Sequence, residues 1–505
     1  MKRMENTGRI RRTLLASARA AVYPPLAPDE IESELIVGSE VDCAHIVMLL
    51  EQKLLPSAVG IELLRAIDRL RRSNFQPLAN RVPLRGLYLM YEDYLIEFAG
   101  PEVGGALQIH RSRNDYNATA QKMAARDPLR KLTAEGARLV AILLAKARRY
   151  KETLMPVYTH GQAALPGSYG FYLSGVAEAL MRELEGLAAA SAQIETCPLG
   201  AGAAVGAAAP IRPERTANLL GFREPCSHAL DAVASRDWAL RLLASCATLG
   251  VLLSRIAADL SQWLTAEFGF LCLPDSLVGS SSAMPQKRNP FLLEHVAGRA
   301  AALPSAFSAA AAAMSRAPFT NAIAANNEGI RPLQDAMKEC RECLLLLRLL
   351  IASAVPDSPI MRARAEAGAT AAAYTAHVLC ARYQLSFRSA HRLLGEAITA
   401  SGEQTGRYCA EFVRHHLDGH GFPVTPAEID PQHAFAAYCS DGGAAPGAVL
   451  RNVEQTSRRL ATFISRARAT QSRWLQARQQ IEHEVRRWLD KSAVSFAMSS
   501  AEVSC

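Results

Sequence analysis

The chain has 505 residues, of which 50% are hydrophobic and 21% charged, and its formal net charge is +8. This is the composition of a soluble globular protein with enough apolar residues for a large buried core. No uninterrupted apolar run reaches the roughly 18 residues of a membrane span, and the first 20 residues lack the apolar stretch of a secretory signal. We therefore predict a soluble, cytoplasmic protein without a membrane partner.

The positive charge by itself would fit a nucleic-acid-binding protein, but only 6% of the residues are aromatic and no basic run is interleaved with them. A small anionic substrate accounts for the surplus equally well. The 11 cysteines are scattered and odd in number, which argues against a disulfide framework, and Cys340 and Cys343 have no second pair to complete a zinc site. Histidines between Glu411 and His420 have helical spacings, but Gly419 interrupts that helix, so we predict no metal site and no cofactor.

In chain order, the basic segment from Met1 to Arg19 is either a plain N-terminal tail or an organelle transit peptide. The alanine and arginine bias of the whole chain favours the tail. Apolar residues then recur at helical spacing in residues 129–147, 173–187 and 242–260. Asp127 and Pro128 are expected to cap and begin the first of these helices.

The alanine-rich segment from Ala306 to Ala313 also predicts a helix, with small side chains that suit a bundle core or a subunit interface. Arginines between Arg466 and Arg487 lie on a polar C-terminal helix, where we expect a solvated face. No segment predicts a strand ladder. We therefore expect a mainly α protein with an N-terminal helical region 1–105, a central long-helix bundle 106–355, a C-terminal helical domain 356–465 and a helical extension 466–505.

Three polar stretches separate the predicted helices. The first runs from Gln108 to Asp115 and concentrates cation, hydroxyl and amide donors suited to a carboxylate, although a helix-capping loop with surface salt bridges is the alternative. The second runs from Met155 to Gln162 and places a histidine in a loop that enters a helix, where imidazole is able to move protons near neutral pH.

The third stretch, Gly279 to Pro290, reads GSSSAMPQKRNP and is the most specific of the three. It brings Ser281, Lys287 and Asn289 together at spacings that no ordinary loop requires. Other segments of note are RSRND, YTHGQAALP, CPLGAGA, LDAVASRDWA, EFGF, SFRSAHRLLGEA and GGAAPGAV, in that order across roughly residues 100 to 450. On these motifs the chain resembles the argininosuccinate lyases of the fumarase/aspartase superfamily.

The resemblance implies a three-region, mostly helical subunit and a homotetramer in which the long central helices form a bundle. Each active site would then gather the three polar stretches from different subunits. The implied chemistry is elimination from a small anionic N-succinyl substrate, which releases fumarate, as in arginine biosynthesis. A catalytically inactive structural or regulatory homologue is the alternative, and nucleic-acid binding through the basic C-terminal tail is a third hypothesis.

The resemblance also implies a role for individual residues. Ser281 would be the base on a mobile loop, and Lys287 and Asn289 would anchor a carboxylate. Thr159 and His160 would lie next to the reacting end, with Glu294 orienting His160. The further substrate contacts that it implies are Ser112, Arg113, Asn114, Gln162 and Arg236.

The chain departs from the family pattern at several positions. Ser280 replaces the glycine before the implied base, and a positive φ there would cost about 1 kcal/mol. Gln108 and His110 stand where histidine and glycine are usual, and Ala27 falls near an expected serine. Asn321, Asn326 and Gly329 occupy positions that the family fills with tyrosine, glutamine and lysine. We therefore expect the fumarate-forming half of the site to be retained and recognition of the leaving group to be altered.

Overall fold

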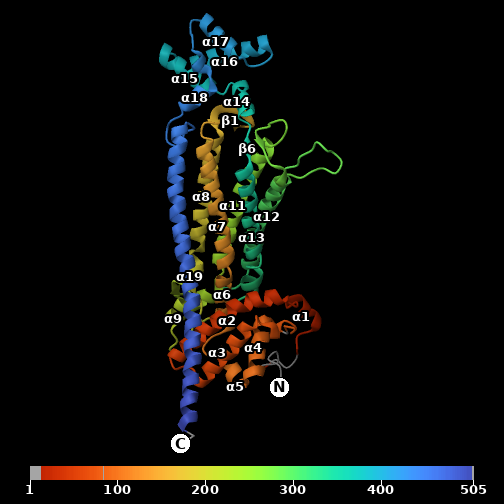
Figure 1. The fold of residues 1–505 in the computed structure, drawn as a ribbon, viewed down its shortest axis with the longest axis vertical. Helices are drawn as coiled ribbons and strands as arrows, with labels where there is room; N and C mark the ends of the chain where they lie inside the picture. Colours follow the sequence, from red (N-terminus) through yellow and green to blue (C-terminus); the bar gives the residue numbers. More distant parts are fainter. Residues whose placement is uncertain (1–8, 10–12, 84, 503–505) are drawn as a thin grey trace.

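The molecule is an elongated helical bundle with a smaller helical region at each end (Figure 1). The structure, a computed structural model, describes residue 9 and residues 13–83 and 85–502, with side chains as far as Lys491. Most of the predicted N-terminal tail or transit peptide therefore lies outside the described residues. The mainly α fold class predicted from helical periodicity is confirmed.

The N-terminal region lies at the lower end of Figure 1 and has its own hydrophobic core. Its helices are α1 (Ala16–Val22), α2 (Pro28–Glu51), α3 (Ser57–Arg72), α4 (Leu87–Ala99), α5 (Pro101–Gly104) and α6 (Arg113–Ala124). Helix α3 buries Ile61, Leu64 and Ile67 on one face, because apolar residues recur at spacings of three and four. This region carries α6, whose first turn belongs to the first polar stretch.

The central bundle contains the long helices that the apolar spacing predicted. They are α7 (Arg126–Arg149), α8 (Tyr169–Ala190), α11 (Asp237–Trp263), α12 (Phe291–Met314) and α13 (Leu333–Ser353), with the short helices α9 (Pro213–Leu219) and α10 (Ala229–Ala234) near their lower ends. The predicted start of α7 was wrong, because the helix begins at Arg126 and Asp127 pairs with Arg130 and Lys131 inside its first turn. Pro304 lies within α12.

Helix α11 is the one helix among the described residues that is long and apolar enough, by length and composition, to cross a membrane. Its leucines Leu242, Leu249 and Leu253 are almost completely buried in the main hydrophobic core. The helix packs against α8, α12 and α13. Its apolar character is therefore explained by its place at the centre of the bundle.

The expectation that no strand ladder forms was wrong, since the described residues contain three short two-stranded pairings. Strands β1 (Leu154–Thr159) and β2 (Gln162–Ser168) form an antiparallel hairpin, β3 (Thr196–Cys197) pairs in parallel with β4 (Glu224–Pro225), and β5 (Leu271–Cys272) pairs antiparallel with β6 (Val355–Pro356). These strands are short, and proline and glycine interrupt the alternation that would reveal a strand.

The C-terminal region lies at the upper end of Figure 1, over the β1–β2 hairpin. Its helices are α14 (Ser358–Ala367), α15 (Ala372–Tyr383), α16 (Phe387–Thr405), α17 (Ala410–Gly419) and α18 (Pro431–Ala436). Helix α19 (Pro446–Glu502) then returns along the whole length of the bundle to the N-terminal region. It is continuous across residue 465, where we placed a boundary, and the four-part division remains a prediction.

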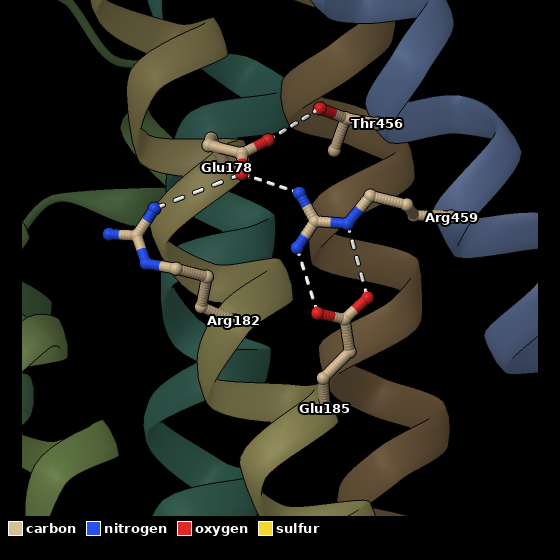
Figure 2. Close-up of polar contacts among 5 residues, drawn as sticks. All are labelled: Glu178, Arg182, Glu185, Thr456 and Arg459. Atoms are coloured by element: carbon tan, nitrogen blue, oxygen red, sulfur yellow. Dashed lines mark hydrogen bonds and ion pairs between the residues drawn. The ribbon is translucent and has the colours of Figure 1, made fainter.

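Several arginines of α19 bind it to the rest of the subunit. Among those between Arg466 and Arg487, the expected solvated face was wrong for Arg473, which is half-buried, whereas Arg466, Arg468, Arg478, Arg486 and Arg487 are exposed. Figure 2 shows Arg459 between Glu178 and Glu185 of α8, with Nε and Nη2 donating to the two Glu185 oxygens at 3.1 and 2.8 Å and Nη1 donating to Glu178. Thr456 Oγ1 also donates to Glu178, at 2.9 Å. Further down α19, three arginines reach other elements or a neighbouring turn: Arg473 pairs with Glu195, Arg478 with Glu40, and Arg487 with Glu484.

We expect Arg459→Met to lower the free energy of unfolding by about 1–2 kcal/mol, because it breaks a charge-assisted pair on a partly exposed surface. Burial acts to raise the pKa of Glu178, but hydrogen bonds from Arg459 and Thr456 outweigh it and hold the pKa below its usual value. This stabilisation is present above the usual carboxyl pKa and is lost as pH falls through the lowered one. Denaturant midpoints at neutral and acidic pH measure it.

The matched control is Arg458→Met, which removes the exposed neighbouring arginine. Equal destabilisation by the two variants at neutral pH would contradict the inference that Arg459 holds α19 against α8.

Candidate active site

His160 lies at the tip of the β1–β2 hairpin, not in a loop that enters a helix as the sequence led us to expect. Thr159 pairs with Gln162, so His160 and Gly161 form a two-residue connection, with φ values of +52° and +74°. Positive φ at both positions is the requirement of a type I′ turn, and it strains a non-glycine residue. The hairpin therefore holds Thr159, His160 and Gln162 at an exposed tip.

The stretch from Gly279 to Pro290 forms a closed loop that projects from the upper part of the bundle, ahead of α12 (Figure 1). Gly279 and Asn289 exchange two backbone hydrogen bonds of 2.8 Å, which shut the base of the loop. Arg288 pairs with Asp275 and donates to the Leu273 carbonyl at 2.8 Å. These contacts hold the two ends of the loop against the bundle, while the segment between Ser280 and Lys287 is largely exposed.

Within this loop the Ser281 hydroxyl oxygen accepts hydrogen bonds from two main-chain N–H groups. The donors are Met284 at 3.1 Å and Ala283 at 3.3 Å. Two N–H groups aimed at one oxygen stabilise negative charge on it, which is what a serine needs in order to act as a base. Ser280 is not among the residues with positive φ, so the condition for a backbone cost at that position is not met in this conformation.

The first polar stretch lies at the opposite, lower end of the bundle, where it begins helix α6. Ser112 is the N-cap of α6, and its Oγ accepts from Asn114 N at 3.3 Å. The helix-capping alternative therefore holds for Ser112, whereas Arg111 is fully buried in an ion pair with Asp42 instead of a surface salt bridge. Arg113 is exposed at the helix N-terminus, where the helix dipole adds to its attraction for an anion.

Three of the positions that depart from the family pattern lie in the N-terminal region. His110 has a φ of +57°, in the left-handed region that glycine occupies without strain. Gln108 donates to the Tyr88 hydroxyl at 2.9 Å and so faces the N-terminal core. Ala27 precedes α2, and its N–H donates to Glu30 at 2.7 Å.

Asp115 is a buried residue of this site that the sequence analysis did not single out. Its Oδ1 accepts from Ser112 N at 3.0 Å and Tyr116 N at 3.1 Å, while its Oδ2 accepts from Gly200 N at 3.0 Å and Gly202 N at 2.9 Å. Asn114 Nδ2 donates to the Ala203 carbonyl at 2.9 Å, in the same glycine-rich loop. The spacing of Ser112 and Asp115, three residues apart before a helix, is a capping-box signal that would have identified this carboxylate.

We expect Asp115→Asn to raise KM about tenfold and to cost about 2–3 kcal/mol of stability, because an amide donor would face main-chain N–H groups without an acceptor. Burial raises the pKa of Asp115, and the backbone N–H groups of Ser112, Gly200 and Gly202 act against that rise. Steady-state kinetics and denaturant titration measure the two effects. The control is Asp127→Asn on α7, and an unchanged KM in Asp115→Asn would contradict the idea that Asp115 positions the start of α6, with Ser112 and Asn114, against the glycine-rich loop.

Arg236 is buried directly before α11, also at the lower end. Its Nε donates to Gln121 Oε1 at 2.9 Å and its Nη1 to the Ser235 carbonyl at 2.8 Å, while its buried Nη2 has no hydrogen-bond partner among the described residues. Burial lowers the pKa of Arg236 to about 10. A nearby anion would act against this shift, because it stabilises the charged guanidinium.

One chain brings only part of the predicted site together. The hairpin with His160 and the loop with Ser281 lie at the upper end, whereas Ser112, Asn114 and Arg236 lie at the lower end (Figure 1). Glu294 is exposed in the first turn of α12, and no described hydrogen bond or ion pair joins it to His160. The residue roles implied by the resemblance therefore remain predictions.

Within the described part of the chain there is no group of three or more histidine, cysteine, aspartate or glutamate side chains that would hold a metal ion. His416 and His420 stack on each other with ring centroids 4.4 Å apart. The described cysteines are all free thiols.

Comparison with known proteins identifies similar chains. A family model described as Lyase matches residues 90–304. The argininosuccinate lyase of Methanoculleus marisnigri is 32% identical over 458 residues, which are 89% of this chain and 92% of that relative. The argininosuccinate lyase of Halorhodospira halophila is 33% identical over 436 residues, which are 84% of this chain and 91% of that relative.

Solved structures share the fold at lower sequence identity. EDDS lyase in complex with formate aligns with a TM-score of 0.84 at 22% identity, covering 97% of this chain and 99% of that one. Class II fumarase from Schistosoma mansoni aligns with a TM-score of 0.67 at 14% identity, covering 79% of this chain and 90% of that one.

The bundle, the serine and lysine loop and these relatives together define a carbon–nitrogen lyase that releases fumarate by elimination. The chain belongs to the argininosuccinate lyase family.

Proposed function

We propose that the substrate is an N-substituted aspartate, either argininosuccinate or a related N-succinyl adduct, from which the enzyme releases an amine or guanidine product. The observation that carries this proposal is the Ser281 oxygen held by two main-chain N–H groups on the loop that also bears Lys287 and Asn289. A base and two carboxylate-binding side chains on one loop are what elimination next to a carboxylate requires.

In the proposed mechanism, Ser281 as its alkoxide removes the proton from the carbon beside one carboxylate. Lys287 and Asn289 hold that carboxylate, so the negative charge that develops on the carbon spreads onto a group already paired with donors. The C–N bond then breaks, the electron pair leaves with the nitrogen, and the nitrogen takes up a proton. In this proposal Thr159 and His160 would lie next to the departing nitrogen, and in the assembled oligomer Glu294 would orient His160 by accepting from one ring nitrogen.

Ser112, Arg113, Asn114, Gln162 and Arg236 are proposed as further substrate contacts. A single chain separates these groups between its two ends, which supports an assembly in which each site is built from several copies. We propose a homotetramer with the central helices at its core, acting in the cytoplasm on a small anionic substrate, with no nucleic acid or membrane as partner.

The experiment follows the ultraviolet absorbance of fumarate with a panel of N-succinyl compounds, including argininosuccinate. We expect fumarate from at least one adduct. Fumarate from none of them, with the assembled oligomer intact, would favour a structural or regulatory homologue instead. Binding of RNA or DNA that weakens steeply with added salt would point to the third hypothesis, since phosphate contacts depend on salt in this way.

A further inference from the structure

A chain of amide side chains connects the surface of the lower end to the buried Arg236. Gln121 Oε1 accepts from Arg236 Nε at 2.9 Å, and Gln121 Nε2 donates to the main-chain carbonyl of Asn326 at 2.8 Å. Asn326 Nδ2 in turn donates to Oδ1 of the exposed Asn321. We call these four residues, Arg236, Gln121, Asn326 and Asn321, the amide network.

The amide network contains one unmatched donor and one unmatched acceptor. Arg236 and Asn326 are only 3% and 5% exposed, and Arg236 Nη2 and Asn326 Oδ1 are buried without a hydrogen-bond partner among the described residues. Both residues hydrogen-bond to the Gln121 side chain, Arg236 through Nε and Asn326 through its main-chain oxygen. Buried polar atoms are normally paired, so two such atoms around one glutamine indicate a polar group that completes the network.

The backbone that carries Asn326 is unusual. Residues Ala324–Glu328 form a π-helical turn, closed by Gly329 N donating to the Ala324 carbonyl at 2.8 Å. Such turns are rare and occur often at functional sites. The segment 317–330 has Glu328 as its single ionisable residue, so it contributes no cation of its own.

One member of the amide network, Gln121, lies on the same helix, α6, as the proposed contact Asn114. Asn114 and Gln121 are seven residues apart on α6 and therefore share a face, about 10 Å apart along the helix axis. An N-substituted aspartate held near Asn114 would reach the network with its other end, which is the leaving group. This step rests on the proposed function.

We propose that the amide network selects the leaving amine, and that it favours one ending in an uncharged group with both an acceptor and a donor, such as a carboxamide or a urea. The carboxamide oxygen would accept from Arg236 Nη2 while its NH₂ donates to Asn326 Oδ1. A carboxylate satisfies Arg236 but places a second acceptor against Asn326 Oδ1, which costs free energy in a buried site.

The test compares two adducts of matched shape, N-(3-amino-3-oxopropyl)aspartate and N-(2-carboxyethyl)aspartate, which differ in a terminal carboxamide or carboxylate. Fumarate release by the wild-type enzyme is expected to show a kcat/KM about tenfold higher for the carboxamide. Asn321→Lys places a cation at the end of the network and is expected to shift the ratio of the two toward the carboxylate about tenfold. The control, Asn327→Lys, adds the same charge on an exposed residue next to Asn326 and is expected to leave the ratio near wild type.

Three results would overturn the proposal. The first is equal or better use of the carboxylate adduct, or of argininosuccinate, by the wild-type enzyme. The second is a ratio that Asn321→Lys does not change. The third is a ratio that Asn327→Lys changes as much as Asn321→Lys does. If no adduct yields fumarate, the proposed function fails and takes this inference with it, whereas fumarate from the wrong adduct overturns the inference alone.

Discussion

Ser281→Ala is expected to reduce the kcat for fumarate release by about 10²–10⁴-fold, the usual contribution of a positioned general base. The substitution removes the oxygen to which the N–H groups of Ala283 and Met284 donate hydrogen bonds. Ser281 lies in an exposed loop whose two ends are held by contacts that do not involve Ser281. We therefore expect the fold and the KM to change much less than kcat. Initial rates with the best adduct, together with a thermal melt, measure both effects.

The control for this prediction is Ser282→Ala, one residue along the same loop, whose exposed side chain has no role in the proposed mechanism. It should retain most of the activity. Full activity in Ser281→Ala would show that another group is the base, and equal losses in the two variants would point to a general effect on the loop.

Mixing two inactive variants with lesions at opposite ends of the subunit is expected to restore activity. Ser281→Ala alters the upper end and Asn114→Ala the lower end, and each should be nearly inactive by itself (Figure 1). If different copies supply the two residues, random reassembly of a symmetric oligomer leaves about one site in four without a lesion. Fumarate release after dissociation and reassembly of the mixture measures the recovery.

The control mixes Ser281→Ala with Lys287→Ala, whose lesions lie in the same loop, so every site contains one of them. That mixture should stay inactive. If the mixture of Ser281→Ala and Asn114→Ala also stays inactive while its oligomer reassembles, each site is built from a single copy.

Much of the fold was predictable because helices are encoded locally. Leu242, Leu249 and Leu253 recur with the period of an α-helix, and burying that face needs no knowledge of the neighbouring helix. The β1–β2 hairpin escaped prediction because its strands contain prolines and its turn takes a histidine at positive φ, a residue that does not by itself signal a turn.

The candidate site, like the fold, has parts that the sequence predicts and parts that it does not. The loop with Ser281, Lys287 and Asn289 is contiguous in the chain, so the order of its residues is enough to recognise it. The capping-box spacing marks Asp115 as a helix-capping carboxylate, but its second role needed the tertiary fold, because two of the four N–H groups that donate to it belong to glycines about 85 residues away. The arginines of α19 needed it as well, since a polar helix has the same sequence pattern whether its charges face water or distant glutamates.

The sequence by itself determined that this protein is mainly helical and bears a serine and lysine loop, because local periodicity and a contiguous motif carry that information, while the lyase chemistry followed from the resemblance of its motifs to a family. The tertiary structure decided that the polar stretches lie at opposite ends of one subunit. It also decided that Asn321 and Asn326 connect through Gln121 to Arg236, across a long separation in the chain. Pairing between buried polar groups depends on which segments packing brings together, and no local pattern of residues records it.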